Sequence, residues 1–484
     1  MKREACGIFG AVSSDENKTP FMVYNGLLSV QHRGQEACGI AISDSKDIQL
    51  KRFLGLVTEA IPRSLLSDLK GRVGIGHVRY STVGKTRVRD SQPMMIDYPR
   101  HGIAISQNGN TVNYVELTKE IKEKGRRLNS TSDAELILYI LAEELATTKD
   151  MEDAVLGVME RIEGAFSIIG LTGKNELIAF RDPYGFRPLC YGSSPGMRLF
   201  ASESVALQVN DAELKGDVKP GELIITDKEG KMVKKEVLPC KKCAHCMFEY
   251  VYISRPDSIV DGKSVYDVRV NLGKNLAKTY SSDADIIVPV PDTARPAAEG
   301  ISRETGIPVA EGLIKNRYIG RTFIMPTQEM RDNAINIKMN PNKSVLKDKH
   351  IILVDDSIVR GTTSRRIINL MKKAGAKKVD FFVTCPPLIS PCFYGIDFAT
   401  HGELIAANNT IPEIKKTIGA DNLCYQTIDG LVKSIGHKKS DLCLACLTGR
   451  YKTPLAQKIA DKMKNQTSLK KTKYWELDEG EMNG

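Results

Sequence analysis

Long apolar runs are missing from this 484-residue chain. No stretch approaches the ~20 apolar residues that a helix needs to cross a bilayer. The first residues, MKREA, carry the basic flank of a signal peptide, but the apolar stretch that follows in such peptides is missing. We therefore expect a cytoplasmic protein with no membrane partner.

Aromatic residues are also scarce, at 6% of the chain with a single tryptophan. Lysine and arginine outnumber aspartate and glutamate by 69 to 59, which gives a net charge of +10. The basic residues are spread along the chain and are not interleaved with aromatic residues that could stack on bases. This balance suits phosphorylated small molecules, and we expect no nucleic-acid partner.

The cysteine count is odd, at eleven, which argues against a disulfide framework in a cytosolic chain. The spacing is more informative than the count. Cys240, Cys243 and Cys246 form C-x₂-C-x₂-C, and Cys443 with Cys446 forms C-x₂-C. Both spacings are typical of zinc or iron–sulfur ligands.

The length of the chain predicts two or three domains. In the first half, short apolar runs separated by turns predict a series of buried strands. A helix is predicted to begin after Ser132, with Glu135 completing a capping box. We therefore expect an α+β layered domain. Its predicted strands are 39–43, 102–106, 166–171, 177–180 and 222–226.

The lysine-rich stretch 230–246, which holds Pro239 and three cysteines, marks the predicted domain junction. Beyond it, apolar runs alternate with helical segments such as 363–375, and this alternation predicts βαβ units with a parallel sheet. In such sheets the ligand lies at the carboxyl ends of the strands. The predicted strands are 285–290, 350–354 and 379–385.

The segment HIILVDDSIVRGTTS is the strongest local signal. Two carboxylates, Asp355 and Asp356, follow a buried strand, and a glycine and three hydroxyl residues precede a helix. The hydroxyls and the free amides of a helix N-terminus can cradle a phosphate, and the acidic pair can hold ribose hydroxyls or Mg²⁺. A plain strand–helix turn needs no such pair. The cradle residues are Arg360, Gly361, Thr362, Thr363 and Ser364.

This segment resembles the ribose-phosphate signature of the phosphoribosyltransferases, whose substrate is phosphoribosyl pyrophosphate bound with Mg²⁺. The segment VPVPDTARPAA resembles the pyrophosphate loop of that family. The resemblance implies that Thr293 lies beside the metal with the acidic pair, and that Arg295 lies near the diphosphate. KNRYIGRTFIMPTQEMR resembles the family's closing loop, in which Arg317 and Arg321 would stabilise the leaving diphosphate. The alternative for this loop is a solvated hairpin.

The first half resembles the glutaminase domain of the N-terminal-nucleophile amidotransferases. The resemblance rests on CGIFG, QHRGQE, HVRYST, QNGN and STSDAE. It implies that Cys6 is the nucleophile and that Arg79 and Asp133 hold the carboxylate and amine of glutamine. It also implies that Asn108, with the amide of Gly109, forms the oxyanion hole. RDPYGFRPL is similar to a segment of the same family, and no catalytic role is assigned to it.

The base that activates Cys6 has two candidates. In the family the free α-amine of the cysteine serves, and its pKa of about 7.7–8.0 suits a base at neutral pH. That role requires removal of Met1–Ala5 as a propeptide, because the nitrogen of Cys6 is otherwise an amide. The alternative is a Cys–His pair with His32 or His77.

The resemblance also selects four cysteines as ligands of a structural [4Fe–4S] cluster, as in one branch of the enzymes that join these two domains: Cys246, Cys392, Cys443 and Cys446. Cys240 and Cys243 depart from that pattern, and they could supply ligands or bind a separate zinc. Zinc in place of the cluster is the other alternative. The remaining cysteines, Cys38, Cys190, Cys385 and Cys424, are expected in the core.

The two resemblances together cover nearly the whole chain. They imply an N-terminal-nucleophile glutaminase of α+β layered sheets followed by an α/β phosphoribosyltransferase. Ammonia from glutamine would pass internally to phosphoribosyl pyrophosphate and give 5-phosphoribosylamine, the first committed step of purine synthesis. The predicted parts are a propeptide (1–5), a glutaminase domain (6–235), a junction (236–255), a phosphoribosyltransferase domain (256–470) and a tail (471–484).

Family membership further implies Mg²⁺ as a cofactor, a homotetramer and feedback inhibition by purine nucleotides. Two other classes of protein remain as alternatives. A nucleotide-binding regulator would have no need of the four glutaminase residues together, and we find no helix-turn-helix segment. A different amidotransferase would lack the acidic pair and the RGTTS cradle.

Overall fold

The structure is a computed structural model that describes residues 6–44, 47–80, 87–97, 102–240, 242–316, 339–398 and 400–465. The predicted propeptide (1–5), Arg317, Arg321 and the predicted tail (471–484) lie outside the described residues. Among the described residues, no helix is long and apolar enough to cross a membrane.

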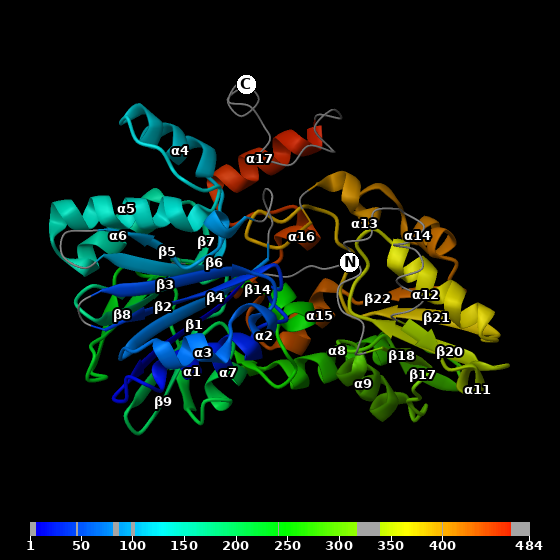
Figure 1. Cartoon of the computed structure of the whole chain (residues 1–484). Helices are drawn as coiled ribbons and strands as arrows, with labels where there is room; N and C mark the ends of the chain where they lie inside the picture. Colours follow the sequence, from blue (N-terminus) through cyan, green and yellow to red (C-terminus); the bar gives the residue numbers. More distant parts are fainter. Residues whose placement is uncertain are drawn as a thin grey trace.

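Two antiparallel sheets packed face to face form the first half of the chain (Figure 1). The larger sheet has the order β11-β9-β10-β1-β4-β2-β3, and its strands are Gly7–Ser13 (β1), Ala37–Ser43 (β2), Ile48–Leu54 (β3), Val73–Arg79 (β4), Cys190–Ser194 (β9), Met197–Ala201 (β10) and Glu213–Asp217 (β11). The smaller sheet has the order β13-β12-β8-β7-β6-β5, and its strands are Met94–Ile96 (β5), Ile103–Thr111 (β6), Gly164–Thr172 (β7), Glu176–Arg181 (β8), Glu222–Thr226 (β12) and Met232–Glu236 (β13).

Strand β1 shows why the sheets pack in layers. Its residues alternate between two cores because successive side chains of a strand point to opposite faces. Ile8 and Val12 join the core between the sheets, whereas Phe9 and Ala11 join the core beneath the helices. The strand is therefore apolar at every core-facing position, and every residue of it is buried.

Helices cover the outer faces of both sheets, which confirms the predicted α+β layered domain (Figure 1). The larger sheet is covered by Thr19–Ser29 (α1), Val57–Ala60 (α2), Arg63–Asp68 (α3) and Val205–Gln208 (α7). The smaller sheet is covered by Tyr114–Glu123 (α4), Asp133–Thr148 (α5) and Met151–Arg161 (α6).

The predicted capping box of α5 is wrong. Ser132 does occupy the N-cap position, but its side chain makes no capping hydrogen bond. The Glu135 carboxylate instead accepts hydrogen bonds from the backbone N–H groups of Asn129 and Ser130, at 2.7 and 2.6 Å. The glutamate therefore binds the two backbone N–H groups of the turn before the helix and does not bind the N–H of Ser132.

The second half is built on a parallel sheet, as predicted, with the strand order β17-β20-β21-β22 (Figure 1). Three of its four strands were predicted, and β22 was not. Its strands are Ile286–Pro289 (β17), His350–Asp355 (β20), Lys378–Val383 (β21) and Asn422–Tyr425 (β22). Helices Thr362–Lys373 (α12) and Ile411–Ile418 (α14) cover one face. Helices Val265–Thr279 (α8) and Arg295–Thr305 (α9) cover the other.

The halves share buried contacts beyond the connecting chain. Much of the segment 247–253 after Cys246 is buried, including Met247 and Tyr250. Strand His245–Cys246 (β14) pairs with Leu442–Cys443 (β23), and helix Pro454–Asn465 (α17) reaches the first half. The backbone N–H of Leu455 donates to Glu163 at 2.8 Å. The predicted junction (236–255) thus includes a buried segment that contributes to the core.

Candidate active sites

Cys6 lies directly before strand β1. Its thiol donates to the carbonyl oxygen of Tyr80 at 3.7 Å, and its own carbonyl accepts from Nε of Arg33 at 3.1 Å. Burial raises the pKa of the thiol, and the nearby guanidinium of Arg79 only partly opposes this. The thiol is therefore neutral at physiological pH, so a base must take its proton before it attacks.

Arg79 and Asp133 bring opposite charges to the same sulfur, since both act on the pKa of the Cys6 thiol. Arg79 ends strand β4, and its buried Nη1 has no hydrogen-bond partner among the described residues. Asp133 begins helix α5 and accepts hydrogen bonds from Nε2 of Gln107 at 3.0 Å and from the N–H of Thr111 at 3.1 Å. A free guanidinium N–H suits a carboxylate, and a fixed carboxylate suits an ammonium group.

Asn108 and Gly109 are neighbours on strand β6. Asn108 is fully buried, and its side-chain nitrogen Nδ2 has no partner within the described part of the chain. A Cβ atom at Gly109 would lie 1.9 Å from the carbonyl oxygen of Ala165, so only glycine fits. A buried amide N–H₂ without a protein partner is the kind of donor that an oxyanion hole needs.

His32 and His77, the predicted alternatives for the base, both bond elsewhere. His32 Nε2 lies 2.7 Å from Oε1 of Glu203. His77 is fully buried, and its Nε2 lies 3.2 Å from the carbonyl oxygen of Gln107. Burial lowers the pKa of His77 to about 3. The hydrogen bond of the Cys6 thiol goes to a backbone carbonyl, so the geometry does not favour a Cys–His pair.

A buried network of charged side chains contacts Cys6 through Arg33, and the sequence analysis did not predict it. Arg33 pairs with Glu203 at 2.6 Å and with Glu249 at 2.7 Å, and Arg187 lies 3.1 Å from Glu249. All four side chains are at most 1% exposed. Although burial alone raises the pKa of Glu249, the Arg33 and Arg187 guanidinium groups hold it below its ordinary value. The sequence does not show which of its many charged residues are buried together, so this network could be recognised only in the structure.

The acidic pair lies at the carboxyl end of the central strand β20, as predicted for a parallel sheet. Asp355 ends the strand, and Asp356 accepts a hydrogen bond from Oγ1 of Thr293 at 2.6 Å. The N–H of Cys385 donates to the carbonyl oxygen of Asp356 at 2.8 Å. The pyrophosphate-loop segment and the acidic segment therefore meet.

The cradle residues form the start of helix α12. Gly361 is the N-cap with φ +74°, a left-handed conformation that favours glycine. Thr362, Thr363 and Ser364 supply the first turn, whose N–H groups have no carbonyl partner within the helix. Hydroxyls and amides thus face the same end of the helix, where its dipole favours an anion.

Arg295 and Arg360 are each paired with a nearby carboxylate. Arg295 bonds to Glu311, and its Nε lies 3.9 Å from Asp292. Arg360 bonds to Glu403. Both arginines are about half exposed. Each guanidinium has five N–H donors and is about half exposed, so either arginine can bind a diphosphate with the donors that its carboxylate leaves free.

The four cysteines assigned to a cluster come from three segments that converge. Cys246 and Cys443 are directly opposite each other on β14 and β23, and the carbonyl of Cys446 accepts from Ile389 N–H at 2.9 Å. Burial raises the pKa of the Cys446 thiol, and the charges of Cys392, Cys443 and Cys246 raise it further. The same causes, burial first, raise the pKa of Cys443.

Cys240 and Cys243 contact each other, with their sulfur atoms 2.9 Å apart. Burial raises the pKa of Cys240 to about 12. The four cysteines expected in the core, Cys38, Cys190, Cys385 and Cys424, are all buried. Among the residues that the structure describes, no three His, Cys, Asp or Glu side chains are placed as a ready metal site.

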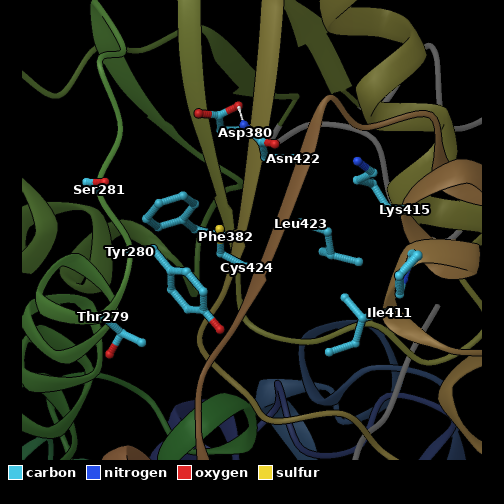
Figure 2. Close-up of a pocket in the computed structure, with 11 residues that line it drawn as sticks. Thr279, Tyr280, Ser281, Asp380, Phe382, Ile411, Lys415, Asn422, Leu423 and Cys424 are labelled. Atoms are coloured by element: carbon cyan, nitrogen blue, oxygen red, sulfur yellow. Dashed lines mark hydrogen bonds between the residues drawn. The ribbon is translucent and has the colours of Figure 1, made fainter.

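A cavity of about 510 Å³ opens beside the edge strand β22 (Figure 2). Tyr280, Phe382 and Leu423 line it, and Asp380 bonds to Asn422 at 2.8 Å on its rim. Asp380 lies near the beginning of strand β21, whereas the acidic pair follows the end of β20. The cavity therefore does not belong to the sugar-phosphate site.

The chain matches two domain families. Residues 77–209 match a glutamine amidotransferase domain, and residues 257–390 match a phosphoribosyl transferase domain. The amidophosphoribosyltransferase of Methanocaldococcus jannaschii is 48% identical over 463 residues, covering 93% of this chain and 98% of its own. That of Bacillus subtilis is 40% identical, covering 94% of this chain and 95% of its own.

Solved structures give the same result. The glutamine phosphoribosylpyrophosphate amidotransferase of B. subtilis, complexed with ADP and GMP, superposes with a TM-score of 0.86 at 39% identity. The similarity covers 93% of this chain and 98% of that one. Both halves of the chain are therefore matched in sequence and in fold.

Proposed function

The chain belongs to the amidophosphoribosyltransferase family, and we propose that the two sites described above divide the family's reaction between them. The chain transfers the amide nitrogen of glutamine to phosphoribosyl pyrophosphate, and the products are 5-phosphoribosylamine, glutamate and pyrophosphate. This is the first committed step of purine biosynthesis. The observation that carries the division is the placement of Arg79 and Asp133 close enough to Cys6 for both charges to act on its thiol, with a buried Nη1 on Arg79 that has no partner among the described residues.

In the glutaminase half-reaction, Cys6 attacks the side-chain amide of glutamine. Arg79 binds the substrate carboxylate and Asp133 its ammonium group, which places the amide carbon near the sulfur. The tetrahedral intermediate carries a negative oxygen, and Nδ2 of Asn108 with the N–H of Gly109 donates to it. Collapse of the intermediate releases ammonia and leaves a thioester, which water hydrolyses to glutamate.

The base for this attack is the α-amine of Cys6 itself. Neither nearby histidine bonds to the thiol, and burial keeps the thiol protonated. The amine is a base only after residues 1–5 are removed. Cleavage of that propeptide is thus the step that activates the glutaminase.

We expect the mature protein to begin at Cys6. Intact-mass measurement and N-terminal sequencing of protein purified without oxygen check this directly. A chain that starts at Met1 or Lys2 and still hydrolyses glutamine would contradict the α-amine mechanism. The matched measurement on a Cys6→Ala chain tests whether cleavage itself needs the cysteine.

In the transferase half-reaction, the first turn of α12 binds the 5-phosphate and the acidic pair holds the ribose. The donor set of Asp355, Asp356 and Thr293 consists of oxygen atoms, which fits Mg²⁺. The metal, when bound, stabilises the charge that develops on the leaving diphosphate. Arg295 and Arg360 add positive charge near the diphosphate, and Arg317 and Arg321 are assigned the same role.

The segment 392–398 contacts the glutaminase strand, which supports an internal path for ammonia. The Asn110 side chain donates to the carbonyl of Phe393 at 2.8 Å, and the Tyr80 hydroxyl donates to Asp397 at 2.6 Å. Gly395 packs against Gly109. A residue of the oxyanion hole is therefore in direct contact with the second half of the chain.

The four converging cysteines support a [4Fe–4S] cluster with a structural role. Sulfur donors suit iron–sulfur clusters and zinc alike. Cys246 and Cys443 lie on the paired strands β14 and β23, Cys446 lies in the helix Ala445–Thr448 that follows, and the thiols of Cys392, Cys443 and Cys246 are close enough to act on the pKa of Cys446. The family resemblance favours the cluster. Its ligands are Cys246, Cys392, Cys443 and Cys446, and it supplies cross-links between segments distant in sequence.

Protein purified without oxygen is expected to contain iron and inorganic sulfide in equal amounts. Cys443→Ser should remove both and lower the melting temperature, because the cluster ties β23 to β14. Cys424→Ser, a buried thiol beside the β22 cavity (Figure 2), is the matched control and should keep the iron. Zinc in the wild-type protein, or no metal, would contradict the cluster.

Two further properties follow from family membership. A homotetramer is the proposed assembly. Purine nucleotides are the proposed feedback inhibitors, which is supported by the B. subtilis structure in complex with ADP and GMP.

A further inference from the structure

Arg187 is a buried arginine in the segment 181–189, for which the sequence suggests no role. It is 1% exposed, and its backbone carbonyl accepts a hydrogen bond from Ser167 Oγ at 2.8 Å. Its guanidinium reaches two groups. Nε donates to Oδ1 of Asn108 at 3.4 Å, and Nη2 lies 3.1 Å from Oε1 of Glu249.

The contact with Asn108 decides which way that side-chain amide points. An asparagine amide has an acceptor oxygen on one side and a donor nitrogen on the other. If the amide turned over, its N–H₂ would face the N–H of Arg187, and two donors would oppose each other. With Oδ1 on Arg187, Nδ2 is left as the free donor, and this atom is buried without a partner among the described residues.

Glu249 connects Arg187 to Cys6 through Arg33. Its carboxylate accepts from both Nη1 and Nη2 of Arg33, at 3.0 and 2.7 Å, and from Ser254 Oγ at 2.8 Å. Arg33 in turn donates to the carbonyl of Cys6. One carboxylate thus accepts hydrogen bonds from Arg33, which contacts Cys6, and forms an ion pair with Arg187, which contacts Asn108. Glu249 lies only three residues after Cys246.

We propose that Arg187 is a positioning residue of the glutaminase, which keeps Nδ2 of Asn108 directed at the oxyanion, and that Glu249 holds Arg187 in place. This inference rests on the proposed roles of Cys6 and Asn108. Arg187 acts through the orientation of the amide, and its hydrogen bond to Oδ1 also polarises the Nδ2–H donors.

A double-mutant cycle with Arg187→Met and Asn108→Ala tests the proposal. Loss of one oxyanion donor costs about 10²–10³-fold in kcat. We expect Arg187→Met to lower kcat for glutamine hydrolysis by a factor approaching that range, with little change in KM for glutamine. The double variant should be no slower than Asn108→Ala alone, because the arginine has nothing left to orient. A further loss in the double variant comparable to that of Arg187→Met alone would overturn the proposal.

Arg181→Met is the matched control. Arg181 is a fully buried arginine of the same segment, and it pairs with Asp261 at 2.6 Å. If both substitutions lower kcat equally, the effect comes from losing a buried ion pair and the proposal fails. Alkylation of Cys6 by iodoacetamide needs no oxyanion hole, but its rate follows the thiolate fraction, and the charge of Arg187 lowers the pKa of the Cys6 thiol. The rate is therefore measured in Arg187→Lys, which keeps the charge, and it should equal that of the wild type. A slower rate would mean that the substitution impairs the nucleophile, and the positioning role would fail.

Two outcomes separate this proposal from the one on which it rests. If Asn108→Ala hydrolyses glutamine normally, the oxyanion assignment itself is wrong. If Asn108→Ala is impaired but Arg187→Met is not, only the positioning role fails. Ammonia-dependent synthesis, which needs only the second site, reports folding. If Arg187→Met does not fold, Arg187→Lys enters the same cycle, and it should recover part of kcat because lysine can still donate to Oδ1.

Discussion

A Cys6→Ala variant is expected to lose glutamine-dependent synthesis and to keep ammonia-dependent synthesis. Without the sulfur no thioester can form, and loss of a nucleophile costs on the order of 10⁴–10⁶-fold in kcat. The acidic pair and the cradle lie in the other half of the chain, so free ammonia still reacts there. Initial rates of pyrophosphate release with glutamine and with an ammonium salt, measured side by side, give both numbers.

Cys38→Ala is the control for this variant. Cys38 is a fully buried thiol on strand β2, the neighbour of β4, and burial raises its pKa to about 12. It should show normal rates with both nitrogen donors. If Cys6→Ala hydrolyses glutamine as fast as the wild type, Cys6 is not the nucleophile. Equal loss with both donors would indicate unfolding or a damaged transferase site.

The elements that sequence predicted best are those whose signal is local. A run such as HIILV is apolar over the length of one strand, and buried parallel strands are read directly from such runs. The step from that strand to Asp355 and Asp356 needs no long-range information either, because a parallel sheet places its ligand where the strand ends. The parallel sheet, three of its four strands and the position of the acidic pair were therefore predictable, whereas the edge strand β22 was missed.

The charge network behind Cys6 was not predictable in this way. Arg33 and Glu249 are 216 residues apart, and nothing near either residue specifies the pairing. A buried arginine and an exposed one look alike in sequence, because the side chain is the same and only the fold decides its partner. The same reason explains Arg295 and Arg360, whose carboxylate partners Glu311 and Glu403 could not be named in advance.

The capping box at Ser132 and Glu135 was wrong for a local reason. The pattern S-x-x-E is satisfied in the sequence, but the turn before the helix offers the glutamate two amides and the hydroxyl of Ser130. A carboxylate with several donors in reach binds the set with the best geometry. The S-x-x-E rule considers only the spacing of the two residues and not the other donors near the glutamate. It therefore predicts the start of the helix correctly and the capping hydrogen bonds incorrectly.

The double substitution Asp355→Asn and Asp356→Asn is expected to abolish synthesis with either nitrogen donor. Asparagine keeps the shape and one acceptor oxygen of each side chain, but it removes both negative charges. Without them Mg²⁺ loses its anionic ligands, and the leaving diphosphate loses the charge stabilisation that a bound metal supplies. Loss of at least about 10³-fold in kcat/KM for phosphoribosyl pyrophosphate should follow with ammonia as well as with glutamine.

Two measurements separate this loss from a folding defect. Asp356 accepts hydrogen bonds from Thr293 and Ser357, and its charge stabilises the buried guanidinium of Arg269, so a modest fall in the melting temperature is expected while the unfolding transition stays cooperative. Asp380→Asn is the matched control, because Asp380 is a buried carboxylate of the same sheet that pairs with His350 at 2.9 Å. That variant should lose stability and keep activity. Normal use of ammonia by the Asp355, Asp356 double variant would instead mean that the sugar phosphate binds elsewhere.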